Sequence, residues 1–312
     1  MRILVVGAGA LGGYFGGRLK EAGRDVTVLV RPHRAEHLAK TGLVVRSPKG
    51  DIAIAAPPTV LAENLSTPFD LILLSCKAYD LQNAMDSFAP AIGASTAILP
   101  LLNGMKHMDL LAARFSAGAV LGGIISATLD DEGRILHLND THFLSFGEQN
   151  GAKSPRVVAI ATAFSGAKFD SQLSTAILQE MWEKWAFIAA AAGICCLMRG
   201  AFGDIAAAGA SQLASDMFGE CCAIAAKNGF NPGETAVKRS VGMLTAAGSP
   251  IAASMLRDIE RGAPIEADHI VGDLLARGGA RPGDYPLLQI AYAHLRTYEA
   301  RRQREQAAAP KR

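Results

Sequence analysis

A glycine-rich turn near the N-terminus carries the strongest chemical signal in the sequence. Six residues, Gly7-Ala8-Gly9-Ala10-Leu11-Gly12, match the pattern G-x-G-x-x-G and stand between a short aliphatic run and a helical pattern. In this pattern the first glycine permits a tight turn, the second lets the backbone approach a pyrophosphate, and the third allows helix and strand to pack closely. A helix that begins here offers free N–H groups and a positive dipole to an anion. The turn predicts a dinucleotide site, and a glycine turn without a ligand is the less favoured alternative.

The residue that follows the second predicted strand bears on which dinucleotide is bound. An NAD site commonly carries Asp or Glu there, where the carboxylate holds the ribose 2′-hydroxyl. Here the strand is followed by Arg31, with Arg34 close behind, and the nearest acid, Glu36, comes several residues later. A cation at this point suits the 2′-phosphate of NADP, although an arginine in a surface loop is also common. The pattern favours NADP(H) as the cofactor.

Two further polar residues come directly after predicted strands. Lys77 follows an aliphatic run that ends at Cys76, and Asn103 follows a second run that ends at Leu102. In an open α/β sheet, ligands bind at the carboxyl ends of the strands, where the glycine turn also lies. An Asn-Gly pair is ordinarily only a turn, and a lone lysine is ordinarily solvated. Their shared edge makes Lys77 and Asn103 candidate ligand-binding residues.

Lys184 stands on an apolar helical stretch in the second half of the chain, within the run Met181-Trp182-Glu183-Lys184-Trp185-Ala186-Phe187-Ile188. Because most faces of this helix are apolar, much of it should be buried. A lysine in that setting either extends its amine to water or lines a cleft. Burial would lower the pKa of the amine and make it a usable proton donor. Composition alone favours the solvated arrangement, so both interpretations stay open.

Hydroxyl and acidic side chains gather on two later helices. Ser254 and Asp258 stand on one helix face, and Glu266 begins the next helix. By itself Glu266 is most often a helix-start carboxylate that interacts with the dipole. Since no second cluster at ligand spacing accompanies Glu266, Asp268 and His269, no metal site is expected.

Elements must position these residues, and the N-terminal half predicts strands alternating with helices. A strand, the glycine turn, a helix and a second strand form a βαβ unit that opens the chain. The expected strands are residues 2–6, 25–30, 69–76 and 96–102, and the expected helices are residues 11–22 and 81–88. Residues 120–129 and 134–146 should form a hairpin, which would put antiparallel strands at the edge of the sheet.

The sequence changes character after Pro155, and strand signals nearly vanish after Leu173. The helical stretches that follow are residues 174–198, 212–227, 250–260, 265–275 and 286–304, the first of them either one helix or two that meet near Gly193. We therefore predict two domains, at residues 1–173 and 174–312. The fold class is α/β, with an N-terminal Rossmann-type, mostly parallel sheet plus an all-α C-terminal domain.

Composition narrows the class of protein. The chain has 312 residues, 50% of them hydrophobic, which suffices for a core in each of two domains. A formal net charge of +2 excludes nucleic-acid binding driven by overall positive charge and leaves a local basic patch open. Five cysteines, four of them in adjacent pairs, favour buried small hydrophobes in a reducing compartment over a disulfide framework. The most apolar stretch, Trp185 to Met198, falls short of the roughly 20 residues that span a bilayer, and the N-terminus lacks a signal-peptide pattern, so a cytoplasmic protein is expected.

Taken together, the sequence resembles the ketopantoate reductase (2-dehydropantoate 2-reductase) family over essentially its whole length. The matching segments are Gly7 to Gly12, Arg31, Cys76-Lys77-Ala78, Asn103-Gly104, Trp182-Glu183-Lys184, and the run Ser254-Met255-Leu256-Arg257-Asp258-Ile259 that leads to Ile265-Glu266-Ala267-Asp268. The last run is the most specific, because its order and spacing are not general Rossmann features.

The resemblance implies NADPH as the hydride donor and a small 2-oxo acid as the substrate. By motif position, Lys184 would be the catalytic acid and Glu266 its partner on the cofactor or substrate side. Lys77, Asn103 and Glu266 join the cofactor-binding residues, and Asn103, Lys184 and Ser254 are the expected substrate-binding residues. Neither nucleic acid nor a membrane is expected as a partner, and a homodimer is allowed.

One departure from the family concerns the helix that carries Lys184. Members of the family typically have asparagines one and two helical turns later that contact the substrate, whereas this chain has Ile188 and Ala192. A site built to hydrogen-bond a substrate hydroxyl discriminates through that bond, so its loss should change substrate preference. The leading interpretation is reduction of 2-dehydropantoate to pantoate. The alternatives are reduction of another small 2-oxo acid, and a non-catalytic NADP sensor.

Overall fold

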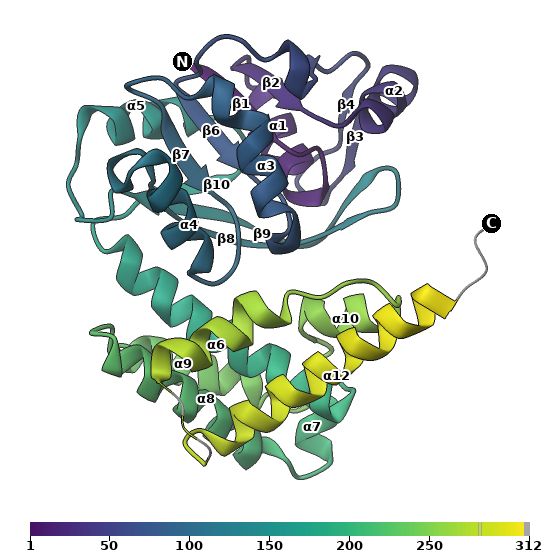
Figure 1. Cartoon of the computed structure of the whole chain (residues 1–312), viewed down its shortest axis with the longest axis vertical. Coiled ribbons are helices and arrows are strands. Elements are labelled where there is room, and N and C mark those ends of the chain that lie inside the picture. Colours follow the sequence, from purple (N-terminus) through teal and green to yellow (C-terminus); the bar gives the residue numbers. More distant parts are fainter. Residues whose placement is uncertain (280, 282, 309–312) are drawn as a thin grey trace. The chain divides into compact units, whose positions relative to one another are not determined.

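The computed structural model describes residues 1–279, 281 and 283–308, and these fold into two compact units (Figure 1). The first unit comprises Met1–Leu102 and His107–Leu178, and the second comprises Asn103–Lys106 and Gln179–Arg312. The short segment Asn103–Lys106 therefore packs with a unit whose other residues come much later in the chain. The boundary predicted from the sequence, between residues 173 and 174, lies at the end of strand β10 (Asp170–Leu173).

A parallel five-stranded sheet forms the centre of the first unit, in the order β5-β2-β1-β6-β7. Its strands are β1 (Arg2–Val6), β2 (Asp25–Leu29), β5 (Thr59–Val60), β6 (Leu71–Leu74) and β7 (Ala97–Pro100). Strands β6 and β7 are buried along their whole length, as expected for a parallel sheet covered on both faces. The four predicted parallel strands are thus confirmed, and the sheet places the carboxyl end of β1 between those of β2 and β6.

A second sheet in the same unit corrects the expectation for the hairpin. Strands β8 (Gly122–Asp131) and β9 (Ile135–Gly147) do pair antiparallel. They do not extend the parallel sheet as a further strand: within the described residues, β7 and the segment before β8 share an isolated parallel bridge between Ile98 and Val120. Strand β9 instead pairs with β3 (Leu43–Arg46) and β10, and β4 (Ile52–Ile54) pairs with β3. The 13-residue β9 is thus divided among three partners, with β3 near its start, β10 near its end, and the 10-residue β8 along most of its length.

Helix α1 (Ala10–Glu21) lies between β1 and the second sheet, and its glycines permit the close packing. A Cβ added to Gly16 would come within 3.0 Å of the Val5 side chain in β1. A Cβ added to Gly13 would overlap the Ile135 side chain in β9. The remaining helices of this unit are α2 (Pro32–Thr41), α3 (Leu81–Phe88), α4 (Lys106–Phe115) and α5 (Pro155–Phe164), with short 3-10 turns η1 (Ala62–Asn64), η2 (Ala78–Asp80), η3 (Ala89–Ala91) and η4 (Ala117–Ala119).

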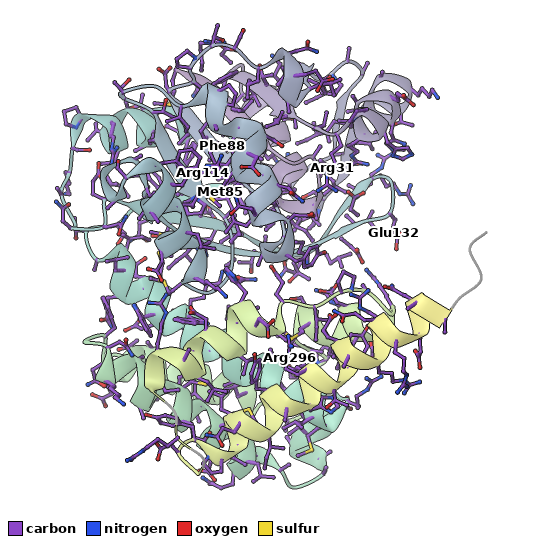
Figure 2. The ribbon with its side chains drawn as sticks, in the orientation of Figure 1. Arg31, Met85, Phe88, Arg114, Glu132 and Arg296 are labelled. Carbon is purple, nitrogen blue, oxygen red and sulfur yellow. The ribbon has the colours of Figure 1, made fainter. Side chains whose placement is uncertain are left out.

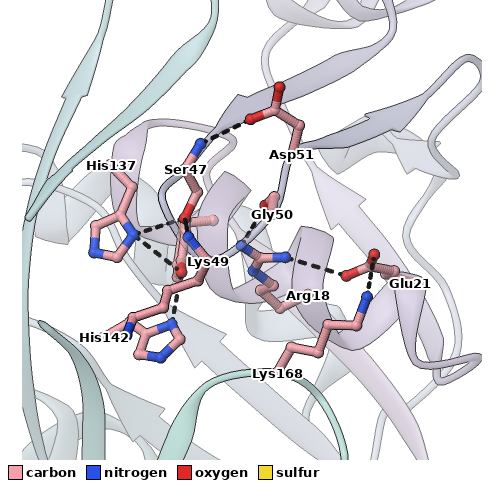
Figure 3. A network of polar contacts seen from close by, with 10 residues as sticks. Arg18, Glu21, Ser47, Lys49, Gly50, Asp51, His137, His142 and Lys168 are labelled. Carbon is pink, nitrogen blue, oxygen red and sulfur yellow. Dashed lines mark hydrogen bonds and ion pairs between the residues drawn. The ribbon is translucent and has the colours of Figure 1, made fainter. Parts of the chain in front are cut away.

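A network of polar contacts joins α1 to residues of the second sheet and its loops (Figure 3). The Tyr14 hydroxyl lies 2.8 Å from Nδ1 of His142, and the Ser47 hydroxyl lies 2.9 Å from Nδ1 of His137. With both hydroxyls donating, each Nδ1 accepts, and the cluster is satisfied with both histidines neutral. Burial, the largest effect, lowers the pKa of His142 below its ordinary value, and the Asp170 carboxylate opposes it. The fully buried Arg18 guanidinium lies over the Tyr14 ring and also disfavours a charged His142.

All regular elements among the described residues of the second unit are helices. Its elements are α6 (Ile177–Met198), α7 (Phe202–Ala207), α8 (Ser211–Lys227), α9 (Glu234–Leu244), α10 (Ser254–Glu260), the π-helix η5 (Asp268–Gly272), α11 (Asp273–Gly278) and α12 (Pro286–Ala308). Helix α6 is one continuous helix, so the alternative of two helices meeting near Gly193 is wrong. Glycine at position 193 lets neighbouring helices pack closely, because a Cβ there would lie 2.5 Å from the Met217 sulfur and 3.2 Å from Ala291. These helices complete the predicted fold class of an α/β unit followed by an all-α unit.

Helix α6 is longer than the apolar stretch that the sequence analysis judged too short to span a bilayer. It has 22 residues, and among the described residues it is the one helix whose length and composition would allow it to cross a membrane. However, 67% of its most apolar stretch is buried inside the protein, as in the core helix of a folded unit. The thiols on α6 are core groups too, since burial raises the pKa of Cys195 to about 11 and of Cys196 to about 12.

Candidate active site

The predicted glycine turn connects β1 to α1, and each glycine meets a different steric demand. Gly7 has a φ of +96°, a left-handed conformation that favours glycine. A Cβ on Gly12 would overlap the carbonyl oxygen of Gly7 and the hydroxyl of Ser75. A Cβ on Gly9 would meet no protein atom within 4 Å. Glycine at position 9 is therefore not required by the protein's own packing, and the space beside it can admit a ligand.

Ser75 is not among the site residues predicted from the sequence, yet it supports this turn. It follows β6, and its hydroxyl lies 2.8 Å from the carbonyl oxygen of Val6 and 3.2 Å from that of Gly7, to which it donates. The adjoining start of α1 has no side-chain cap and no acidic residue in its first turn. Its N–H groups thus present a positive end that suits a phosphate. The one sequence signal for Ser75 is a hydroxyl directly after an aliphatic strand.

The two predicted arginines follow β2, with Arg31 (Figure 2) at the N-terminal end of α2 and Arg34 in its first turn, and their contacts differ. Arg31, at the start of α2, is 72% exposed and forms an ion pair of 2.8 Å with Asp80. Arg34 donates to the backbone carbonyl of Ala8 at 2.7 Å, and forms an ion pair of 3.1 Å with Asp131. Arg34 therefore braces the glycine turn, whereas Arg31 presents a cation to solvent beside it.

Lys77 lies at the same edge of the parallel sheet. It precedes the 3-10 turn η2, after the end of β6, and its side chain is exposed. Strand β6 is the direct neighbour of β1, so Lys77 and the glycine turn leave the sheet at adjacent strand ends. This position suits a contact with a ligand held at the turn.

The second unit brings Lys184 and Asn103 together, although they are 81 residues apart in sequence. The Lys184 ammonium donates to the side-chain carbonyl of Asn103 at 3.1 Å. Desolvation lowers the pKa of Lys184 from its ordinary 10.5 to about 8. At neutral pH the amine is therefore mostly protonated, but it releases its proton far more readily than a solvated lysine does. Lys184 is half-buried, so its amine is partly desolvated, in contrast to the solvated arrangement that composition favours.

The other predicted residues of the helical unit lie on separate segments. Ser254 is the first residue of α10 and is exposed, and Glu266 is half-buried shortly before the π-helix η5. The Glu266 carbonyl oxygen accepts from the backbone N–H of Ile270 at 3.0 Å, an α-type bond next to the π-helix. Ile188 and Ala192 follow Lys184 by four and eight residues on the continuous α6, so all three share one helix face.

Among the described residues, no three His, Cys, Asp or Glu side chains lie close enough together to hold a metal ion.

A parallel Rossmann-type sheet with this glycine turn, followed by a helical unit with a desolvated lysine, defines a class of dinucleotide-dependent oxidoreductases. Comparison with known families identifies the particular one. Residues 3–151 match the family model "Ketopantoate reductase PanE/ApbA", and residues 176–299 match the model of its C-terminal part. The chain belongs to the ketopantoate reductase family and is an oxidoreductase.

Individual relatives agree with this assignment. The uncharacterized oxidoreductase YkpB of Bacillus subtilis is 40% identical over 96% of this chain and 99% of its own. The crystal structure of 2-dehydropantoate 2-reductase from Methylococcus capsulatus is 28% identical, covers 97% of this chain and 98% of its own, and has a TM-score of 0.86. The ternary structure of D-mandelate dehydrogenase with NADH and anilino(oxo)acetate shares the fold, with a TM-score of 0.84 over 97% of this chain and 100% of its own at 19% identity.

Proposed function

We propose that this protein is an NADPH-dependent reductase of a small 2-oxo acid, with 2-dehydropantoate, the precursor of pantoate in pantothenate biosynthesis, as its leading substrate. The observation that carries the proposal is the Lys184 ammonium, which combines a pKa of about 8 with a hydrogen bond to Asn103. A general acid works best when its pKa lies near the working pH. Family membership supplies the class of reaction, and this pair supplies a proton donor suited to it.

The residues of the first unit fit a dinucleotide. The open space at Gly9 and the uncapped start of α1 suit its pyrophosphate, with Lys77 close by at the neighbouring strand end. The exposed cation of Arg31 suits a 2′-phosphate, which supports NADP(H) over NAD(H). When bound, the reduced nicotinamide supplies a hydride to the carbonyl carbon of the substrate.

Lys184 supplies the proton that completes the reduction. As the carbonyl carbon gains a hydride, its oxygen gains negative charge, and the ammonium stabilises that charge and transfers a proton to the oxygen. The product hydroxyl thus takes its hydrogen from Lys184 Nζ, and the neutral amine recovers a proton from solvent. Asn103 orients the ammonium, while Ser254 and Glu266 are proposed to contact the substrate and cofactor.

Ile188 and Ala192 support a second substrate class within the same reaction. They continue the helix face of Lys184 with apolar side chains, and Ala192 is only 3% exposed. A substrate side chain against the half-buried Ile188 would find no hydrogen-bonding group there, and the buried Ala192 adds none behind it. A 2-oxo acid with an apolar side chain is therefore the alternative substrate.

The test is the loss of NADPH absorbance with a panel of 2-oxo acids that includes 2-dehydropantoate. We expect turnover with this compound or with an apolar 2-oxo acid. Tight NADPH binding without oxidation by any member of the panel would contradict the proposal and support an NADP sensor in the cytoplasm.

Arg31→Ala tests the choice of cofactor. Loss of a charge-assisted phosphate contact should weaken NADPH binding by about 1.5–3 kcal/mol and leave NADH binding nearly unchanged. Equal losses for the two cofactors in a binding titration would contradict the assignment of NADP(H).

A further inference from the structure

The turn that carries Asn103 is packed against a residue with no place in the proposed chemistry. His269 is buried, and its imidazole forms a hydrogen bond with the backbone of Asn103. Gly104, the next residue, has a φ of +80°. A Cβ on Gly104 would lie 2.9 Å from the carbonyl oxygen of His269 and 3.2 Å from its ring carbon Cδ2. Asn103 and Gly104 therefore fit against His269 without room for a larger residue at position 104.

His269 belongs to the π-helix η5, which is held from two other helices. The indole Nε1 of Trp185, the neighbour of Lys184 on α6, donates to the carbonyl oxygen of Ile270 at 2.8 Å. The hydroxyl of Tyr292 on α12 donates to Asp268 at 2.7 Å. Single π-turns within helices are frequent at functional sites, because the extra residue redirects backbone carbonyls and side chains. Here the π-helix η5 links α6, through Trp185, to the turn that carries Asn103.

The protonation state of the His269 imidazole suits a permanent hydrogen bond to Asn103. Burial, together with the nearby cations of Lys106 and Arg277, lowers the pKa of His269 to about 4, while the bond to Asn103 opposes this effect. The ring is therefore neutral at physiological pH and has a single N–H to donate. Because the hydrogen bond with the Asn103 backbone raises the pKa of the imidazole, the ring is the donor, and the bond restrains its orientation.

We propose that His269 is a positioning residue for the proposed reductase: it holds the Asn103–Gly104 turn so that the Asn103 side chain faces the Lys184 ammonium. This inference rests on the proposed function only where it is tested by measuring turnover. Asn103 accepts a hydrogen bond from the charged form of Lys184, and such a bond stabilises that form and raises the pKa. Without His269 the ammonium should lose this partner, so its pKa should fall and its orientation should loosen.

Two substitutions at position 269 separate the hydrogen bond from the packing. His269→Phe fills a similar volume without a donor, and His269→Asn keeps an N–H donor on a shorter side chain. We expect His269→Phe to lower kcat by about ten- to hundredfold, as a small misplacement of a reacting group does, with NADPH affinity within about twofold of wild type. The alkaline limb of the pH profile should move to lower pH. His269→Asn should recover part of both effects.

Tyr292→Phe is the matched control, because it removes a different hydrogen bond from the same π-turn. We expect it to lower Tm without moving the alkaline limb. The proposal is overturned if His269→Phe keeps the wild-type kcat and pH limb, if His269→Asn is as impaired as His269→Phe, or if Tyr292→Phe moves the limb equally.

A titration of the Lys184 amine by NMR in the full chain tests the contact without turnover. His269→Phe should lower the pKa of this amine relative to wild type, and an unchanged value would refute the positioning role. If the wild type reduces no 2-oxo acid while this shift is observed, the proposed function fails and the contact between His269, Asn103 and Lys184 stands.

Discussion

At the scale of single residues, the protonation state of Lys184 is the quantity that the proposed reaction depends on. With a pKa of about 8, the amine is charged at neutral pH and becomes neutral as the pH rises. A general acid must be protonated, so kcat/KM for reduction should be level below this pKa and should fall as the pH rises through about 8. Initial rates across the pH range measure this limb. A profile that stays level well above it would exclude Lys184 as the acid.

Removal of the Lys184 amine should lower the rate of the chemical step rather than the affinity for the cofactor. Lys184→Met keeps much of the aliphatic stem and should lower kcat by about 10²–10⁴-fold, the usual contribution of a positioned general acid. NADPH affinity should stay close to that of wild type, because the glycine turn and Arg31 belong to the other unit. A variant with normal turnover would show that Lys184 is only a packed lysine.

At the scale of elements, two glycines in the turn between β1 and α1 should affect different properties, Gly9 the binding of the ligand alone and Gly12 also the stability of the protein. Gly9→Ala should leave Tm unchanged, since its Cβ meets no protein atom within 4 Å, and should weaken NADPH binding by blocking the pyrophosphate. Gly12→Ala should lower both Tm and affinity, because its Cβ overlaps the Gly7 carbonyl and Ser75. Thermal unfolding and a binding titration measure both effects. Tight NADPH binding by Gly9→Ala would place the ligand elsewhere.

The face of α6 beyond Lys184 is the second feature at this scale. Ile188→Asn combined with Ala192→Asn restores the amides typical of the family and should shift preference toward 2-dehydropantoate. One well-made hydrogen bond contributes about 1 kcal/mol, or several-fold in specificity. The measurement is kcat/KM for 2-dehydropantoate against a 2-oxo acid that lacks the hydroxyl.

Folding of this double variant must be checked first, because Ala192 is buried and an unpaired amide there would destabilise the core. If the wild type already prefers 2-dehydropantoate strongly and a folded double variant gains nothing, the apolar face does not set specificity.

At the scale of the whole molecule, each unit contains a buried histidine whose pKa is lowered on folding, His142 in the first and His269 in the second. The unfolded chain binds a proton near the ordinary value of 6.5, whereas the folded chain resists it. This stability is therefore complete above pH 6.5 and is lost as the pH falls toward the folded pKa. For His269, with a folded pKa of about 4, the loss by pH 5 should be roughly 2 kcal/mol.

Urea unfolding at pH 7 and at pH 5 measures this loss above the range in which carboxylates titrate. His269→Phe should reduce the difference for the helical unit, and Tyr292→Phe should leave it intact. The same midpoint at both pH values in the wild type would contradict the buried, neutral state of both histidines.

Local sequence determined much of the first unit. The glycine turn, the β1-α1-β2 unit and the cation at position 31 could be predicted because their demands are steric or electrostatic over a few residues. A positive φ at Gly7 and a close helix at Gly12 need glycine, whatever the rest of the chain does. The amphipathic or apolar periods of the later helices are local as well, and their order along the chain was enough for the fold class.

Tertiary structure decided what depends on segments far apart in sequence. The pairing of the long β9 with β3 and β10 is one case, because β3 comes about 90 residues earlier in the chain and the pattern of a strand does not name its partner. Ser75 and His269 are others, since neither residue type has a marked signal until its partner is known.

The state of Lys184 depended most on the fold. Its sequence surroundings favoured a solvated amine, yet desolvation lowers its pKa to about 8, and its hydrogen-bond partner Asn103 comes 81 residues earlier. Sequence determined that a lysine stands on an apolar helix. Only packing determined that its charge is partly desolvated, because desolvation is a property of all the atoms around a group and not of its neighbours along the chain.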